Sequence, residues 1–288
     1  MDDIKVTVNP YNFNNKLINI QFVENILKQF DIEDSINSLD LYQQSFVHNS
    51  YIKKDPEEIG ENIVIADKPE GALPLFVYDY ERLEYLGDAV VSIITARYLY
   101  ERYPDEDEGF LTKLRTKLVN GEMLSFLAQK LNFGEYAIVS RHIEDKCNGR
   151  NSINIPEDIF EAFIGAMFLD FNEKDNYNLL DKYYSGIGFQ ICEKFLINVF
   201  ETYIDFSELI IRNTNYKEQL NKYFHTKYDS HIIFSEPSIE GGLNNKIYTV
   251  NVIDKESHIL GIGIGKSKKK AEQYACKDTL EKLNIIDT

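Results

Sequence analysis

The sequence predicts two domains, an all-α domain over residues 16–212 and a small α+β domain over residues 214–285. Three observations indicate this division. A length of 288 residues suits two domains of roughly 150 residues each. Apolar residues recur at three- and four-residue spacing through most of the chain, which is typical of helices. After Asn213 the pattern changes to a helix, three strand-like segments and a closing helix.

The helices of the first domain follow the apolar spacing and the positions of proline. Residues 16–52 are expected to be helical. Their regularly spaced apolar residues are Leu17, Ile20, Val23, Ile26 and Leu27. Residues 53–79 are acidic and contain three prolines, which predicts an exposed insertion. A long apolar helix is expected at residues 80–103, ending before Pro104. Further helices are expected at residues 110–131, 156–171 and 188–212.

The second domain has the order α-β-β-β-α. Helical spacing predicts helices at residues 215–225 and 267–283, and the strands between them are expected at residues 231–235, 246–253 and 258–264. The last helix would cover the sheet with its apolar face, formed by Ala271, Ala275, Leu280 and Leu283.

Charge is distributed unevenly over a chain whose formal net charge is −16. From Asn215 to the end there are 11 Lys and 10 acidic residues, net +1, so the rest of the chain is at −17. Such an acidic body argues against a nucleic-acid partner at first sight. Acids can also gather as a solvated surface or as ligands of a cation, so their positions decide.

One narrow acidic stripe lies on the helix expected at residues 80–103. At about 100° per residue, Glu81, Glu84 and Asp88 share a stripe under about 90° wide. Apolar residues fill most of the remaining circumference, so we expect this helix to be largely buried. A solvated acidic face usually has a wider polar surface of mixed charge. The stripe therefore favours a ligand or catalytic role, with the solvated face as the alternative.

The helix expected at residues 156–171 repeats this arrangement. Asp158, Glu161 and Gly165 form one stripe on an otherwise apolar helix. The glycine would allow another backbone to approach this stripe closely. The alternative is that the two carboxylates cap the helix or form structural ion pairs.

Two acidic stripes on buried helices indicate a shared divalent cation. Carboxylates without histidine or cysteine suit Mg²⁺ or Mn²⁺ rather than zinc. An ion held in this way can activate water and neutralise charge at a phosphate, which is the chemistry of phosphodiester hydrolysis.

These segments also resemble a known family. The run Glu81-Arg-Leu-Glu-Tyr-Leu-Gly-Asp88 is similar to the signature of ribonuclease III. Three further blocks match in the same order: Phe46-Val-His-Asn-Ser-Tyr51, Glu108-Gly-Phe-Leu-Thr-Lys-Leu-Arg115 and Asp158-Ile-Phe-Glu-Ala-Phe-Ile-Gly-Ala166. The resemblance implies an all-α endonuclease domain followed by a double-stranded-RNA-binding domain.

Applied residue by residue, the resemblance implies roles for the acids. Glu84, Asp88, Asp158 and Glu161 would hold Mg²⁺, with Mn²⁺ as a substitute. Glu81 and Glu108 would act as auxiliary acids along the RNA groove. Tyr85 stands where the family usually has phenylalanine, inserted into the second subunit of a homodimer, and its hydroxyl would need a partner. Such a dimer cuts both RNA strands, leaving 5′-phosphate and 3′-hydroxyl ends with short 3′ overhangs.

The second domain resembles the double-stranded-RNA-binding domain, with a lysine cluster at the start of its last helix. A helix N-terminus with several lysines is suited to phosphates. Glu218 and Asn221 depart from the usual contact residues, and Asn244 stands near the usual histidine, so we expect weaker or more salt-sensitive binding. The candidate RNA contacts are Lys217, Glu218, Asn221, Asn244, Lys246, Lys268, Lys269 and Lys270.

Other features limit the remaining functions. The sequence has neither a membrane-spanning apolar run nor a signal-peptide pattern, and its three scattered cysteines suit a reducing compartment, so we expect an intracellular protein, cytoplasmic or nuclear. The glycines between Gly261 and Gly265 superficially resemble a nucleotide-binding loop, but Leu260 and Lys266 break both common patterns, so no nucleotide cofactor is expected. A non-catalytic binder of double-stranded RNA and an enzyme cutting another duplex, such as an RNA–DNA hybrid, are the alternatives.

Overall fold

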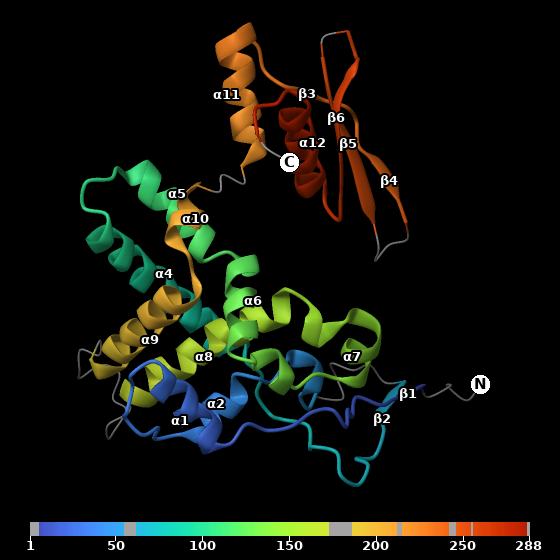
Figure 1. Cartoon of the computed structure of the whole chain (residues 1–288). Helices are drawn as coiled ribbons and strands as arrows, with labels where there is room; N and C mark the ends of the chain where they lie inside the picture. Colours follow the sequence, from blue (N-terminus) through green and yellow to red (C-terminus); the bar gives the residue numbers. More distant parts are fainter. Residues whose placement is uncertain are drawn as a thin grey trace. The chain divides into compact units, whose positions relative to one another are not determined.

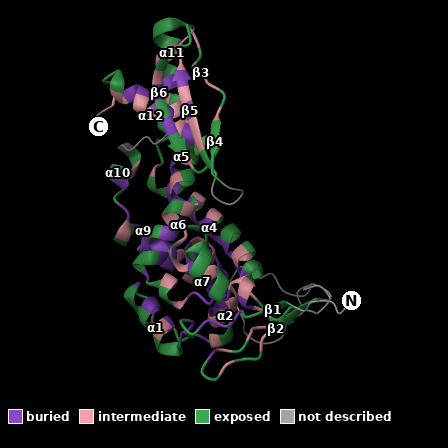
Figure 2. Cartoon of the chain, turned by 90° about the vertical axis from the view of Figure 1, so that its right-hand side faces the viewer, coloured by how far each residue is buried: buried purple, intermediate pink, exposed green. Residues whose placement is uncertain are grey.

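The computed structural model describes residues 6–54, 62–172, 186–211, 215–241, 246–254 and 256–286. The chain divides into two compact units, Met1–Phe206 and Ser207–Thr288 (Figure 1), and each is described by itself. Buried residues lie inside each unit, while exposed residues cover the outward faces of its helices (Figure 2).

The first unit is built mainly from helices. They are α1 (Ile20–Gln29), α2 (Leu39–Gln44), α4 (Glu81–Arg102), α5 (Glu108–Leu118), α6 (Gly121–Lys130), α7 (Arg141–Cys147), α8 (Asn154–Asn172) and α9 (Ile187–Tyr203), and α10 (Phe206–Ile211) follows at the boundary. Short 3-10 turns, η1 (Asn49–Tyr51), η2 (Phe133–Tyr136) and η3 (Gly149–Asn151), join some of them. Helix α8 lies at the centre and packs against α2, α4, α6 and α9.

Aromatic side chains fill the core around α8. Phe163 of this helix lies with its ring centroid 4.8 Å from that of Phe133 and 6.0 Å from that of Phe195. Phe46 contacts both Phe133 and Phe163 edge-on. Edge-to-face and tilted aromatic pairs of this kind add to the free energy gained from area burial. The core therefore fixes α8 against several other elements at once.

Two glycines allow α4 and α8 to cross with their backbones in contact. A Cβ atom at Gly87 of α4 would lie 1.8 Å from the carbonyl oxygen of Glu161. A Cβ atom at Gly165 of α8 would lie 2.2 Å from the carbonyl oxygen of Leu83. The close backbone approach expected at Gly165 is present, and Gly87 is its counterpart on the other helix.

Several predicted helix limits were wrong, in one case because local capping interrupts the apolar pattern. The helix expected at residues 110–131 is divided into α5 and α6, since the Asn120 side chain accepts a hydrogen bond from Met123 N (2.9 Å) and begins a new helix. The helix expected at residues 188–212 is likewise divided into α9 and α10. Residues 16–52 form α1, α2 and η1 rather than one helical stretch.

The body is also less purely helical, and its insertion less exposed, than expected. Strands β1 (Val6–Val8) and β2 (Ile63–Ile65) form a small parallel sheet. Within residues 53–79, Ala72 is buried, and neighbouring apolar residues pack against a core cluster that includes Tyr11 and Tyr51. The Tyr51 hydroxyl donates to the carbonyl of Leu73 (3.0 Å). The described part of the insertion is therefore anchored to the body.

The second unit has the α+β architecture that the sequence predicts. Its elements are α11 (Tyr216–Tyr228), β3 (Ile233–Phe234), β4 (Ser238–Glu240), β5 (Ile247–Ile253), β6 (Ile259–Gly265) and α12 (Lys268–Lys282). Strand β5 pairs antiparallel with β3, β4 and β6, and both long helices lie on one face of this sheet (Figure 1). The strand predicted at residues 231–235 is limited to β3, and β4 is an additional short strand that was not predicted.

The alternation of isoleucine and glycine in β6 comes from its contact with α12. Cβ atoms at Gly261 and Gly263 would lie within 2.2 Å and 2.0 Å of atoms of that helix. These glycines therefore permit close strand–helix packing. Ala271, Ala275 and Leu280 of α12 are buried as expected, whereas Leu283 is 37% exposed because the helix has already ended.

The glycine contact yields a stability prediction. Gly87→Ala should lower the free energy of unfolding by about 1–3 kcal/mol, because the added methyl group forces α4 away from α8 and this outweighs the helix propensity of alanine. Thermal unfolding followed by circular dichroism measures the loss. The control is Gly109→Ala on α5, where the nearest atom to the new Cβ is a side-chain oxygen of Asp107 at 3.3 Å. Equal unfolding midpoints for the two variants would contradict the constraint.

Candidate active site

The α4–α8 crossing brings the two predicted acidic pairs to one place. Glu84 and Asp88 lie on either side of Gly87 along α4. Asp158 lies one turn before Glu161 on α8, and the Glu161 carbonyl is the atom that approaches Gly87. The four acidic residues therefore lie on the parts of α4 and α8 next to the point where the helix backbones meet.

Burial and mutual repulsion raise the pKa values of Glu84, Asp158 and Glu161. Glu161 is only 9% exposed. Burial raises its pKa to about 8, with further contributions from Asp88, Glu157, Glu84 and Asp158. Burial also raises the pKa of Glu84 to about 7, with Asp158 the largest charge acting on it. Each helix thus lies within electrostatic reach of the acids on the other.

No positive side chain compensates for this charge in the part of the chain that the structure describes. Glu84, Asp88, Asp158 and Glu161 have no ion pair there with lysine, arginine or histidine. A buried carboxylate without a partner is costly. The crossing therefore concentrates negative charge, and a bound cation would stabilise it.

Tyr80, the residue before α4, holds one of the acids. Its hydroxyl donates a 2.7 Å hydrogen bond to Oδ2 of Asp158. Burial raises the pKa of Asp158, and this hydrogen bond opposes the rise. Burial beside Asp158 also raises the pKa of Tyr80 far above its ordinary value, so its hydroxyl remains a donor. The His48 ring packs edge-on against Tyr80 at 5.8 Å, and burial lowers the pKa of His48.

The two auxiliary acids lie in different surroundings. Glu81 is exposed at the start of α4, and its Oε1 accepts a 2.6 Å hydrogen bond from Asn49 Nδ2. Glu108 begins α5, accepts a hydrogen bond from the Thr112 hydroxyl (2.8 Å) and lines a groove that also includes Tyr100. Tyr100 is sixteen residues beyond Glu84 on α4, which corresponds to about 24 Å. Within one chain, Glu108 is therefore remote from the four central acids.

Helix α4 is less buried than expected. Asp88 is exposed, and so are the apolar residues Tyr85, Ile93 and Tyr100. The prediction of a largely buried helix was therefore wrong for the chain by itself. A single amphipathic stripe in the sequence does not distinguish burial inside the body from burial against a second molecule.

Two neighbours of the central acids were missed by the sequence analysis. Tyr80 was expected inside the helix at residues 80–103, about 100° from Glu81 and outside the acidic stripe, whereas the structure places it just before α4. Glu157 lies about 100° from Asp158 around α8, outside the predicted stripe, yet its charge raises the pKa of both Glu84 and Glu161. A Cβ atom at Gly121 would lie 2.3 Å from Oε2 of Glu157, so this carboxylate is at the N-terminus of α6, where negative charge is favourable.

The donor set fits a hard divalent cation in its chemistry. It consists of partly buried carboxylates without a compensating positive charge, and oxygen-only sites suit Mg²⁺ or Mn²⁺. The geometry is not preformed, since the described residues contain no group of three histidine, cysteine or acidic side chains close enough to hold a metal ion. The carboxylates would have to turn toward a common point when an ion binds.

The lysine cluster of the second unit is exposed at the beginning of α12. Lys268, Lys269 and Lys270 form the first turn, and Ser267 caps it by accepting a hydrogen bond from Lys270 N (3.3 Å). Lys246 is exposed before β5. These residues are placed as an exposed phosphate-binding surface requires.

The other candidate RNA contacts include residues with a role in folding. Lys217 forms an ion pair with Glu272 (2.7 Å) and lies 4.7 Å from the centre of the Phe234 ring. Asn221 accepts a long hydrogen bond from Ile232 N (3.5 Å), and Glu218 accepts one from Asn215 Nδ2 (2.9 Å). Asn244 lies outside the described residues.

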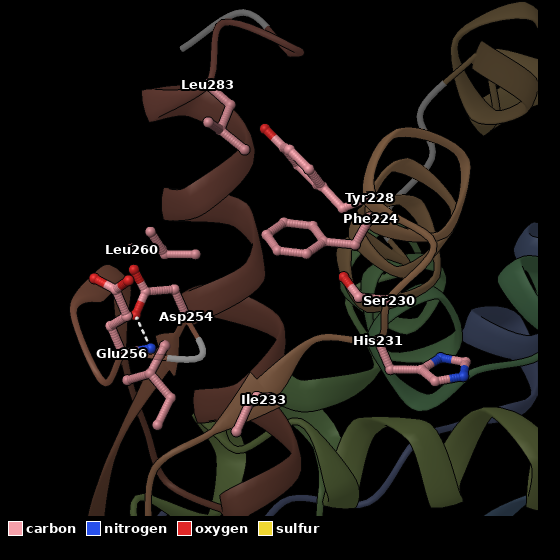
Figure 3. A pocket seen from close by; sticks show the side chains of 10 residues that line it. Phe224, Tyr228, Ser230, His231, Ile233, Asp254, Glu256, Leu260 and Leu283 are labelled. Carbon is pink, nitrogen blue, oxygen red and sulfur yellow. Dashed lines mark hydrogen bonds between the residues drawn. The ribbon is translucent and has the colours of Figure 1, made fainter.

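The second unit also contains a mainly apolar cavity of about 440 Å³ (Figure 3). Phe224 and Tyr228 of α11 line it, together with Leu260 of β6 and Leu283 after α12, and Asp254 lies at its edge. Leu283 follows the C-terminal end of α12, whereas the lysines begin that helix. The cavity therefore contains none of the predicted RNA contacts.

Comparison with known proteins agrees with both units. The family model described as "Ribonuclease III domain" matches residues 81–172, which contain the four central acids. The model described as "Double-stranded RNA binding motif" matches residues 216–283. A helical unit with clustered acids, followed by a double-stranded-RNA-binding unit, defines the class of double-stranded-RNA-binding endoribonucleases.

Sequence relatives identify the family. "Probable ribonuclease 3" of Acanthamoeba polyphaga mimivirus is 31% identical over 277 residues, covering 95% of this chain and 47% of that protein, so the chain spans about half of its length. "Ribonuclease 3" of Ligilactobacillus salivarius is 29% identical over 264 residues, covering 92% of this chain and 99% of that protein. A protein of Paramecium bursaria Chlorella virus 1 is 34% identical over 207 residues, covering 72% and 68%. The chain belongs to the ribonuclease III family, which is divalent-metal dependent.

The length and apolar character of the helices bear on membrane insertion. Among the residues that the structure describes, none forms a helix long and apolar enough to cross a membrane.

The raised carboxyl pKa values predict how stability depends on pH. Glutamates whose pKa is raised in the folded chain favour the protonated form, so their contribution is fully present at low pH and is lost as the pH rises through about 7 to 8. In EDTA, the unfolding midpoint should therefore fall between about pH 6 and about pH 9. Saturating Mg²⁺ should raise the midpoint more at the higher pH. Glu161→Gln should show a smaller fall in EDTA, and a fall equal to that of the wild type would refute the assignment to Glu161.

Proposed function

We propose that this ribonuclease hydrolyses both strands of double-stranded RNA in a divalent-metal-dependent reaction that leaves 5′-phosphate and 3′-hydroxyl ends with short 3′ overhangs. The single observation that carries the proposal is that the α4–α8 crossing at Gly87 brings acids of both helices, none with a described ion pair, within electrostatic reach of one another. Nothing about the fold requires four acids at this crossing, whereas hydrolysis of a phosphodiester at a bound cation does.

In this proposal the four central acids bind the ion together. Glu84, Asp88, Asp158 and Glu161 would bind Mg²⁺, or Mn²⁺ in its place. When bound, the ion supplies a water of lowered pKa and neutralises charge at the phosphate. Glu161 is the most buried of the four, so its carboxylate is the least free to move away. Glu81 remains at the edge of the site, where Asn49 orients it toward an incoming RNA strand.

We also propose that α4 forms the interface of a homodimer. Tyr85 is 83% exposed, and Ile93 and Tyr100 follow at spacings that keep them on the same side of the helix. Exposed apolar stripes of this kind often mark interaction surfaces. The groove between α4 and α5, about 410 Å³ in volume, would accept Tyr85 of the second copy. Glu106 and Glu108 in this groove could accept a hydrogen bond from the tyrosine hydroxyl.

The second unit would deliver the substrate. Lys268, Lys269 and Lys270 at the α12 N-terminus would contact phosphates across the major groove of an RNA duplex, assisted by Lys246. Lys217, Glu218 and Asn221 make contacts within the domain, so their share in binding RNA would be smaller. Cys192 and Cys276 are buried free thiols and Cys147 is an exposed one, which suits a reducing compartment, so we place the activity inside the cell, in the cytoplasm or nucleus.

Removal of one carboxylate tests the catalytic assignment. Glu161→Gln should abolish cleavage of a long RNA duplex in Mg²⁺ while leaving duplex binding unchanged, because the amide keeps the shape but loses the charge that would hold the ion. Product sizing on denaturing gels and a mobility-shift assay measure the two effects. Glu101→Gln, an exposed change near the other end of α4, should cleave like the wild type, since surface ion pairs contribute little. Full activity of Glu161→Gln would contradict the proposal.

A charged residue at position 85 tests the dimer. Tyr85→Arg should shift the chain from dimer to monomer in sedimentation velocity, because the guanidinium would be buried without a partner at the interface. Phe13→Arg replaces another strongly exposed aromatic residue and should leave the dimer intact. A Tyr85→Arg chain that stays dimeric would place the interface elsewhere.

A further inference from the structure

Helix α8 carries two aspartates that each accept a hydrogen bond from a tyrosine hydroxyl. Near its beginning, Tyr80 donates to Asp158 (2.7 Å). Near its end, Tyr42 of α2 donates to Asp170 (3.2 Å). Both tyrosines are buried. The same chemical pair therefore occurs twice on one helix, and the surroundings of the two aspartates differ.

Asp170 has the surroundings of a structural acid. Besides Tyr42, its carboxylate accepts hydrogen bonds from the backbone N–H groups of Asn37 (3.0 Å) and Ser38 (2.6 Å). It is completely buried and joins the segment before α2 to α8. Its lone pairs are used within the fold, as expected for a buried carboxylate with a purely architectural role.

Asp158 has the opposite surroundings. Throughout the described ranges of the chain, Tyr80 is the one group that donates a hydrogen bond to its side chain. Its charged neighbours are other carboxylates, with Glu84 near it across the helix crossing. Repulsion alone would turn such a side chain outward. The Tyr80 hydroxyl fixes Oδ2 and leaves Oδ1 without a hydrogen-bond partner among the described residues.

The position of the Tyr80 hydroxyl is itself fixed on several sides. Tyr80 is 2% exposed, and its backbone N–H donates to the carbonyl of Val47 (2.9 Å). Its own carbonyl accepts the hydrogen bond from Glu84 N (2.9 Å) that begins α4. The His48 ring packs against its side chain. The donor is thus placed by backbone and ring contacts that do not depend on Asp158.

We infer that Tyr80 is a positioning residue for the divalent ion, because its hydroxyl holds Oδ2 of Asp158 and so presents Oδ1 to the site. This inference rests on the proposed function. Groups that hydrogen-bond to metal ligands orient them before the metal arrives, and their loss weakens binding even though they never touch the ion.

The test compares two variants that each remove one hydroxyl from a buried tyrosine. Mn²⁺ is titrated into the full chain without RNA, and free Mn²⁺ is followed by electron paramagnetic resonance. Tyr80→Phe keeps the ring against His48 and should weaken Mn²⁺ binding by about tenfold or more. Tyr42→Phe is the matched control. It should bind Mn²⁺ and cleave RNA like the wild type, although its unfolding midpoint should fall, since Asp170 loses one of its donors.

The outcomes separate this inference from the proposed function. Unchanged Mn²⁺ affinity in Tyr80→Phe overturns the positioning role and leaves the metal site standing. Equal weakening in both variants also overturns it, because the effect would then come from general loss of stability. If the wild-type chain itself binds no Mn²⁺, the metal site and the proposed mechanism are both overturned.

Discussion

The backbone contact between α4 and α8 is the constraint on which the rest of the first unit depends. Gly87 and Gly165 each lie against a carbonyl of the opposite helix, so neither position has room for a side chain. The approach brings Glu84 and Asp88 of α4 within electrostatic reach of Asp158 and Glu161 of α8. Aromatic packing around Phe163 holds α8 from the other sides, so the helices are kept close although their carboxylates repel one another.

The site holds partly buried acids of like charge, which is unfavourable by itself and is tolerated because the surrounding fold is stable. Burial and like charge raise the pKa values of Glu84 and Glu161, which means that the charged form is disfavoured in the folded chain. Strongly perturbed acids that cluster at one place are typical of functional sites. The segment before α4 supplies the few stabilising contacts, through Tyr80 on Asp158 and Asn49 on Glu81. A bound cation would neutralise this buried negative charge, so the folded chain should bind a cation at these acids.

The two units of the chain differ in charge, with acidic residues concentrated in the first and exposed lysines in the second. The acidic residues of the first unit make it unfavourable for a polyanion, since like charges repel. The exposed lysines of α12 place positive charge on the second unit, where we propose the phosphate contacts. Lys217 does not add to this surface in the same way, because its ammonium group is held between Glu272 and the Phe234 ring.

The sequence by itself determined the two architectures, the two acidic stripes and the lysine cluster, because helical periodicity and residue type are local properties. It also indicated the close approach at Gly165, since a glycine within an acidic stripe has no side chain to hold a second helix away. Tertiary structure decided the features that helical periodicity does not encode, namely a helix break, the exposure of one helix face and contacts between distant elements. Asn120 ended a helix inside a continuous apolar pattern, and the Tyr85 side of α4 proved exposed. Tyr80 and Glu157 joined the site from outside the stripes, because contacts between elements far apart in the chain depend on how helices cross.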